Sequence, residues 1–277
     1  MNTPTKHFST LRKRRFWRLL RALLLLLSLS LLIGCDTVYE RPTDTTITTA
    51  PTGDIPASKP SSTTSKKRVA ITFDDGPRSY QEQTKRIVDE LAKYGFTATF
   101  FVVGNRIQKD GTLPYAVEHG CEIGIHGFTH SKDKYFDTCS DEDYEYEISK
   151  TAEAIHKQLP NYDIKLMRPV GGFISPERVS ASPYSVILWD VDSQDWQNTY
   201  YPGISDEDAT KKVDTVVNNV MSAVTDGSII LLHDIYESTY DATKIILQRL
   251  YDEGYDVVSV SELLGDNLMP GRQYSRK

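Results

Sequence analysis

Apolar, β-prone segments that end in ionisable residues are the feature of this sequence that most constrains its fold. Five such segments occur, and they end at Asp74-Asp75, at His126, at Arg168, at Asp190 and at His233. Two adjacent carboxylates at the end of a buried strand are unfavourable, because like charges resist ionising together and burial penalises both. Such a pair therefore indicates a metal ligand or a proton-transfer group. Because the carboxyl ends of the strands form one face of an α/β barrel, we expect these groups to lie together on that face.

Helical periodicity separates the expected strands. The expected strands cover 68–73, 97–103, 121–125, 164–168, 185–191, 228–232 and 255–260, and the expected helices cover 79–94, 112–119, 141–159, 206–225 and 239–253. Ser140 is placed to cap the helix over 141–159, and the acidic run 141–147 is typical of a solvated helix face. Strands that alternate with helices predict a parallel sheet with crossovers. The predicted fold class is α/β, a distorted (β/α) barrel with its active site at the C-terminal ends of the strands.

The N-terminal quarter of the chain predicts export and a spacer. Residues 1–21 carry seven basic residues and no acid, and the apolar run 22–33 is too short to span a bilayer as a mature helix. We assign 1–34 to a signal peptide, 35–67, rich in Thr, Ser and Pro, to a disordered tether, and 68–270 to one folded domain. Residues 32–35, Leu-Ile-Gly-Cys, resemble the bacterial lipobox, in which the cysteine is lipidated. Cys35 is therefore the expected lipid attachment site, and an uncleaved signal anchor is the alternative.

The charge of the expected mature chain limits its partners. Without the leader, 25 basic residues face 38 acidic residues, a net charge of −13. This balance argues against nucleic acid as a partner and is compatible with a neutral or cationic polymer. We expect a monomer held on the outer face of a bacterial membrane by its lipid. Cys121 and Cys139 flank the histidine pair described next, and the sequence leaves open whether they form a disulfide or remain thiols.

Two histidines spaced by four residues, His126 and His130, can chelate one cation. A lone pair with this spacing is a weak signal, but a carboxylate from another strand end supplies a third ligand. Two His and one Asp with open positions compose a catalytic zinc site and also suit non-haem iron.

These motifs together resemble the polysaccharide deacetylases, that is, carbohydrate esterase family 4 or NodB-homology domains. The motifs are Thr-Phe-Asp-Asp-Gly at 72–76, the histidine pair, Arg168-Pro169, Asp195-Trp196 and Leu-Leu-His-Asp at 231–234, in the family's order. The resemblance covers about 68–265 and implies a distorted barrel of the NodB-homology type. It also implies one divalent metal ion held by Asp75, His126 and His130, and zinc is favoured over cobalt or nickel.

The resemblance further implies catalytic and pocket residues. The catalytic residues are Asp74 as general base, Arg168 paired with that base, His233 as general acid and Asp195 orienting the acid. The pocket residues are Trp196 and Leu231 as walls of an acetyl-methyl pocket and Gly171 as an oxyanion donor through its backbone N–H. The implied activity is removal of N-acetyl groups from N-acetylglucosamine residues of a polysaccharide, and cell-wall peptidoglycan is the favoured substrate. Chitin oligomers or xylan as substrate, a peptide amidase and a sugar-binding pseudoenzyme remain alternatives.

Two positions depart from the family pattern. Gly127 stands where the family has Ser or Thr, and Gly171 stands where it has an aromatic residue. The second change leaves open which side chain stacks against the substrate. Tyr200 and Tyr201, from another loop, are candidates.

Overall fold

The computed structural model of this chain describes residues 66–78 and 82–277. The expected signal peptide (1–34), Cys35 and all of the expected tether except its last two residues lie outside the described residues. Within the described ranges, the search for an apolar helix of membrane-spanning length finds none.

A single parallel sheet forms the centre of the described unit. Its strands follow the order β6-β7-β1-β2-β3-β4-β5-β9, and β8 pairs with the first half of β1. The strands are β1 (Lys67–Asp74), β2 (Thr99–Val102), β3 (Glu122–Ile125), β4 (Leu166–Met167), β5 (Ser185–Ile187), β6 (Val191–Asp192), β7 (Ile229–His233), β8 (Tyr255–Val258) and β9 (Gln273–Tyr274). Every named pair runs parallel, so the C-terminal ends lie on one side. The predicted α/β class with a distorted barrel is confirmed.

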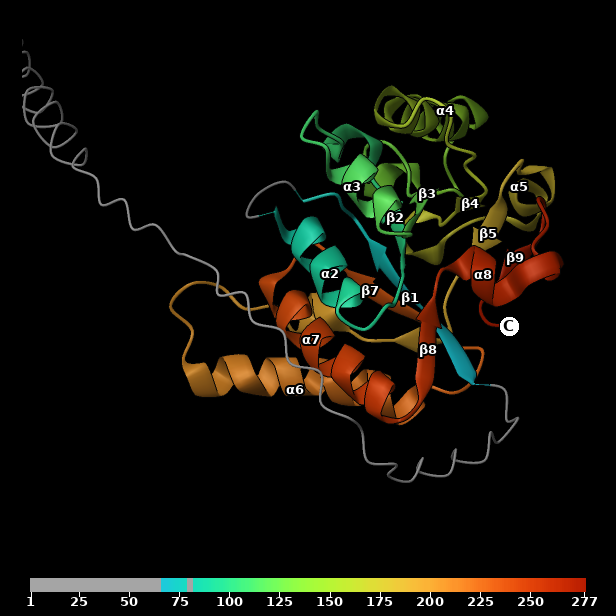
Figure 1. The fold of residues 1–277 in the computed structure, drawn as a ribbon. Helices are drawn as coiled ribbons and strands as arrows, with labels where there is room; N and C mark the ends of the chain where they lie inside the picture. The colour runs from blue at the N-terminus through green and yellow to red at the C-terminus, as the bar shows by residue number, and fades with distance from the viewer. Residues whose placement is uncertain (1–65, 79–81) are drawn as a thin grey trace, which may run out of the picture. The chain divides into compact units, whose positions relative to one another are not determined.

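Helices cover the outside of the curled sheet (Figure 1). They are α2 (Gln83–Ala92), α3 (Thr112–Glu118), α4 (Asp141–Gln158), α5 (Pro176–Ala181), α6 (Asp206–Ala223), α7 (Glu237–Asp252) and α8 (Val260–Leu264). α6 contacts α7, α7 contacts α2, α2 contacts α3 and α3 contacts α4, so these five helices follow one another around the sheet. Val69, Ile71 and Phe73 of β1 point into the core beneath them, and alternation turns Thr72 and Asp74 to the inner side, which carries the polar groups.

The expected strand 185–191 is two strands with different partners, and that prediction was wrong. Leu188 donates its N–H to Tyr274 of β9, whereas Asp190 donates its N–H to Ile229 of β7. The chain therefore crosses between the two ends of the sheet order over residues 188–190. An apolar run shows that a segment is buried, but it does not show where the segment changes its neighbour.

Other elements differ at the edges of the predicted set. β1 begins at Lys67, inside the expected tether, and β9 lies beyond residue 270. α5 lies in a stretch expected to be irregular, and α8 begins where the last predicted strand was to end. α8 packs against the inner side of the sheet, since Val260, Leu263 and Leu264 lie in one cluster with inner residues of the strands.

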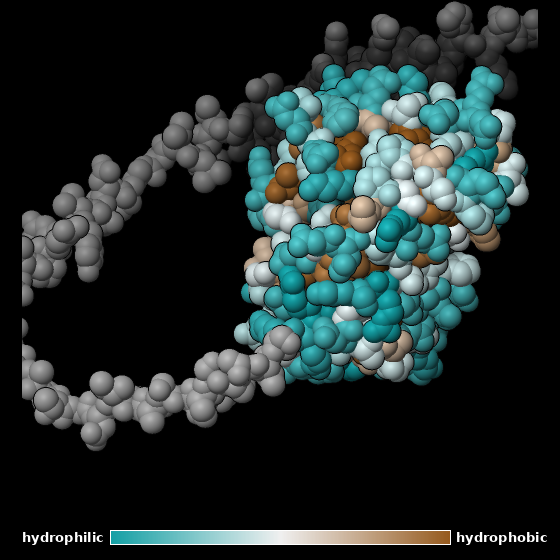
Figure 2. Space-filling model, turned by 90° about the vertical axis from the view of Figure 1, so that its right-hand side faces the viewer, coloured by the Kyte–Doolittle hydropathy of each residue, from teal (hydrophilic) through white to brown (hydrophobic). Residues whose placement is uncertain are grey.

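Neither cysteine of the described unit is paired. Cys121 is buried and Cys139 is half-buried, and both are free thiols. Burial raises the pKa of Cys121 to about 11, which keeps its thiol protonated at neutral pH. Figure 2 shows the side of the molecule that lies to the right in Figure 1, and this face is mainly hydrophilic with small, separate hydrophobic patches.

Candidate active site

The ends of four strands and one short turn bring the predicted site residues together. Asp74 ends β1, His126 follows β3, Arg168 follows β4 and His233 ends β7. Asp195 begins the 3₁₀ turn Asp195–Gln197 after β6. The expectation that ionisable groups at strand ends share one face is confirmed for Asp74-Asp75, His126, Arg168 and His233. It was wrong for Asp190, whose carboxylate accepts hydrogen bonds from the Ser228 hydroxyl and the Ile229 N–H at the start of β7, the opposite end from His233.

Asp75, His126 and His130 form a cluster with the geometry of a metal centre. One ligand atom from each lies within 4.8 Å of the others. Nε2 of His130 is 2.7 Å and Nε2 of His126 is 3.5 Å from Oδ1 of Asp75. That carboxylate oxygen is buried, and apart from the two imidazoles it has no hydrogen-bond donor among the described residues. An orphaned buried anion beside two imidazole nitrogens fits a divalent cation, and this donor set suits zinc.

The surroundings of the cluster orient its ligands. Nδ1 of His126 lies 2.8 Å from the carbonyl oxygen of Arg168, and a proton donated there leaves the Nε2 lone pair for a metal. Asp75 (φ 77°) and His130 (φ 55°) both adopt left-handed backbone conformations, which non-glycine residues rarely do and which concentrate at functional sites. Burial pushes the pKa of Asp75 upward, but the two imidazoles outweigh burial and hold it well below its usual range.

Glu147 of α4 braces the turn between the two histidines. Its Oε2 accepts the N–H groups of Phe128 (2.6 Å) and Thr129 (2.7 Å), and its Oε1 accepts the Thr129 hydroxyl (2.6 Å). Gly127 has φ 80°, and a Cβ there would lie 3.2 Å from the same carboxylate, so glycine fits this turn.

The buried state of Glu147 corrects the prediction that the whole acidic run 141–147 is solvated, since its exposed fraction is 2%. Helical spacing could have shown this. Glu147 shares the buried face of α4 with Tyr144, Ile148 and Thr151.

Arg168 fixes Asp74 from inside the barrel. The guanidinium is fully buried, and its Nη1 donates to Oδ1 of Asp74 at 2.8 Å and to the Thr72 hydroxyl oxygen at 2.7 Å. Its Nε and Nη2 donate to the carbonyls of Ile187 and Leu188, each at 3.0 Å. One oxygen of Asp74 is thereby held by a charge-assisted hydrogen bond. The other, Oδ2, lies 3.6 Å from Nε2 of His126 and faces the metal cluster.

Asp195 holds His233 on the other side of Asp74. Its Oδ1 lies 2.7 Å from Nδ1 of His233, while its Oδ2 accepts the His233 backbone N–H (2.7 Å) and the Thr239 hydroxyl (2.6 Å). Burial lowers the pKa of His233, but the charge and hydrogen bond of Asp195 outweigh it and raise that pKa to about 9. An imidazolium oriented in this way is a proton donor at neutral pH.

The three predicted pocket residues lie in different settings. Leu231 is buried in β7, whereas Trp196 is 52% exposed. Gly171 has φ 63°, and a Cβ at this position would lie 2.8 Å from the ring of Phe173. Phe173 is itself 48% exposed and packs on Tyr135 with ring centroids 4.8 Å apart. The aromatic side chain absent at position 171 is thus replaced in space by Phe173, which sequence spacing did not reveal.

Two further charged residues near the cluster were not predicted. Arg106 donates from Nη1 to the backbone carbonyl of Asp75 at 2.6 Å, which supports the unusual backbone conformation of that residue. Asp234 is fully buried and accepts the Thr84 hydroxyl at 2.5 Å, and burial raises its pKa to about 7. A single arginine in a loop and a buried acid beside His233 carry no periodic signal, so only the fold reveals their contacts.

Comparison with known proteins is consistent with this geometry. A sequence profile described as polysaccharide deacetylase matches residues 61–182. The chain is 31% identical over 212 residues to the peptidoglycan-N-acetylglucosamine deacetylase PgdA of Listeria monocytogenes, covering 76% of this chain and 42% of that protein. The chain thus spans less than half the length of this relative.

Two solved structures share the fold over nearly their whole length. Peptidoglycan deacetylase PdaC from Bacillus subtilis is 37% identical, with a TM-score of 0.62 over 72% of this chain and 90% of that structure. A family 4 acetyl xylan esterase from Clostridium thermocellum in complex with a cobalt ion is 30% identical, with a TM-score of 0.63 over 76% of this chain and 98% of that structure.

Proposed function

The chain belongs to the polysaccharide deacetylase family, and we propose that it is a metal-dependent hydrolase that removes N-acetyl groups from N-acetylglucosamine residues of a polysaccharide. One observation carries the proposal. Asp74 is held between the Arg168 guanidinium on one oxygen and the cluster of Asp75, His126 and His130 on the other. A sugar-binding pseudoenzyme would have lost a ligand or the base, and this chain retains both.

The residues divide the hydrolysis of the amide between a base and an acid. Asp75, His126 and His130 would hold the divalent ion, which supplies Lewis acidity and lowers the pKa of water. Asp74 accepts a proton from the attacking water as oxygen bonds to the acetyl carbon.

His233 then donates its proton to the amide nitrogen as the C–N bond breaks, which releases acetate and leaves a free amine on the sugar. Asp195 keeps His233 protonated and aimed for this step. By the family resemblance, Gly171, three residues after Arg168, would offer its backbone N–H to the developing oxyanion, and Leu231 and Trp196 would form the walls around the methyl group.

The cell's own peptidoglycan is the substrate we favour. The lipobox-like segment ending at Cys35 and the spacer that follows support a monomer anchored on the outer face of a bacterial membrane. A flexible spacer of about 30 residues has an r.m.s. reach on the order of 30 Å, which keeps the domain in the envelope. The names of the Listeria and Bacillus relatives support the same polymer. Cys35→Ala should release the protein from the membrane fraction, and equal retention of wild type and variant would exclude the lipid anchor.

Acetate release from a substrate panel tests the activity. The panel is N-acetylglucosamine oligomers, purified peptidoglycan and acetylated xylan, each assayed before and after removal of metal by a chelator. We expect acetate from peptidoglycan, its loss on chelation, and its return with zinc or cobalt at one ion per chain. Full activity of a metal-free protein would refute the proposal.

Release from xylan alone would instead favour ester hydrolysis, the reaction named for the Clostridium thermocellum relative.

A further inference from the structure

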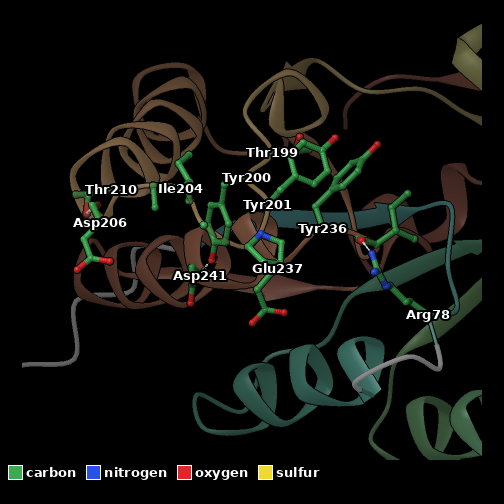
Figure 3. A pocket seen from close by; sticks show the side chains of 14 residues that line it. Arg78, Thr199, Tyr200, Tyr201, Ile204, Asp206, Thr210, Tyr236, Glu237 and Asp241 are labelled. Carbon is green, nitrogen blue, oxygen red and sulfur yellow. Dashed lines mark hydrogen bonds between the residues drawn. The ribbon is translucent and has the colours of Figure 1, made fainter.

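A cleft of about 820 Å³ lies beside the residues of the proposed reaction (Figure 3). It is walled by the loop 199–204, by the start of α6, and by Tyr236 and the first turns of α7. The volume is within the range of pockets that bind small molecules, on the order of 300–1,000 Å³. The reaction itself uses none of the side chains of this cleft.

The cleft continues directly from the active site. Tyr236 follows His233 by three residues, and the two rings have centroids 6.1 Å apart. Arg78 lines the same cleft three residues after the metal-cluster residue Asp75, and its guanidinium donates to the carbonyl of Ile235. A polymer whose reacting unit lies at His233 would therefore run its neighbouring unit past Tyr236 into the cleft.

The loop presents one tyrosine to solvent and anchors the other. Tyr200 donates its hydroxyl to Asp241 of α7, which fixes the base of the loop. Tyr201 is 74% exposed, the most exposed of the large hydrophobic side chains in the described residues. In Figure 3 its ring rises from the cleft on the same side as the Tyr236 ring, and Tyr201 is among the groups that raise the pKa of Tyr236, after burial and two acids. An exposed ring beside a polar cleft offers an apolar face with hydrogen-bonding groups around it.

The charged lining restricts the ligand. Asp206, Glu237 and Asp241 line the cleft. Glu237 is held by Arg86 through two hydrogen bonds of 2.8 and 3.0 Å, and Asp241 lies 2.6 Å from Lys244. Three acids against one cation, Arg78, give the lining no excess of positive charge, which disfavours an anionic ligand such as a peptide carboxylate or a phosphate. The lining offers carboxylate oxygens to sugar hydroxyls, so a neutral saccharide is the ligand class that fits.

We propose that this cleft binds the sugar unit next to the one being deacetylated, with the Tyr201 ring stacked on that sugar. The inference rests on the proposed function and specifies its substrate as an oligomer that extends past His233 toward α6. Binding energy from the neighbouring unit then orients the acetyl group, so catalytic efficiency rises with chain length.

Kinetics on short and long substrates test this inference. The probes are the N-acetylglucosamine monomer, which has no neighbouring unit, and the fully N-acetylated chito-oligosaccharide pentamer, assayed with zinc-loaded protein. Wild type should have a higher kcat/KM for the pentamer than for the monomer. Tyr201→Ala should lower kcat/KM for the pentamer about tenfold and for the monomer much less, the scale expected for loss of one aromatic contact. Tyr201→Phe should retain the wild-type ratio, because it keeps the ring.

Tyr251→Ala is the matched control, since Tyr251 is an exposed tyrosine (54%) at the far end of α7 and outside the cleft. It should leave the pentamer-to-monomer ratio of kcat/KM unchanged. The inference fails if wild type shows no gain with chain length, or if Tyr201→Ala keeps the wild-type ratio. Absence of acetate release from every substrate by wild type would instead refute the proposed function, so the two failures are distinguishable.

Discussion

Replacing Asp195 by asparagine should move the alkaline limb of the pH–rate profile to lower pH. Rate is lost above the pKa of the acid, and the structure makes His233 that acid. Burial lowers the pKa of His233, but the charge and hydrogen bond of Asp195, with smaller contributions from Asp74 and Asp75, outweigh burial and raise this pKa from 6.5 to about 9. Without the Asp195 charge we expect the pKa to return to about 6.5 or below.

The expected displacement follows from these values. From about 9 to about 6.5 the limb moves by about 2.5 pH units, which corresponds to about 3 kcal/mol of net stabilisation of the protonated His233. A divalent ion in the cluster repels a protonated His233 and lowers its pKa in both proteins. The difference between wild type and variant is therefore the quantity to compare.

The assay is kcat/KM for a chito-oligosaccharide between about pH 5 and about pH 10.5. Asp192→Asn is a suitable control, because this exposed acid lies close by in the chain and makes no contact with His233. Its alkaline limb should coincide with that of wild type. Circular dichroism should verify that Asp195→Asn is folded, since Asp195 also accepts the hydrogen bonds of Trp196 and Thr239. An alkaline limb within about half a pH unit of wild type in a folded Asp195→Asn protein would refute the assignment of the acid.

Three further outcomes are expected. Because the folded pKa of His233 lies above its unfolded value, its contribution to stability is complete below about pH 6.5 and is lost as pH rises through about 9, so the free energy of unfolding of apo protein should fall over this window by up to about 3 kcal/mol. Asp74→Asn should lower kcat by roughly 10²–10⁴, the scale of general base catalysis. Glu147→Gln should weaken zinc binding roughly 10- to 100-fold in calorimetric titration of apo protein, because it loosens the turn that carries His130.

Each outcome has a control. Asp195→Asn should flatten the pH dependence of unfolding measured by urea titration, and an unchanged slope would contradict the linkage. Asp74→Asn removes the charged partner of the buried Arg168 guanidinium and should lower the melting temperature, so turnover is compared where circular dichroism shows the variant folded. Near-normal turnover there would exclude Asp74 as the base. Glu145→Gln alters an exposed acid on the same helix and should leave zinc affinity unchanged. Equal zinc affinities of wild type and Glu147→Gln would show that the turn does not depend on this carboxylate.

The sequence by itself determined which residues meet at the site. Asp74, His126, Arg168 and His233 each follow an apolar run, and in a parallel sheet such ends must lie on one side. The run length, the helical periodicity between runs and the motif order are local properties of the chain. They predicted the class of fold, and the resemblance to the polysaccharide deacetylases that the motifs carry implied the metal cluster and the acid–base pair before any contact was known.

Only the tertiary structure decided how these residues are supported. Arg106 reaches the Asp75 carbonyl across 31 positions of the chain, and Glu147 reaches Phe128 across 19. Phe173 fills the space beside Gly171, and Tyr201 stands exposed over a cleft formed with α7. The split of 185–191 into β5 and β6 likewise depends on which strand lies alongside. Such contacts join segments whose separation is fixed only when the sheet curls, so no local pattern of residue types encodes them.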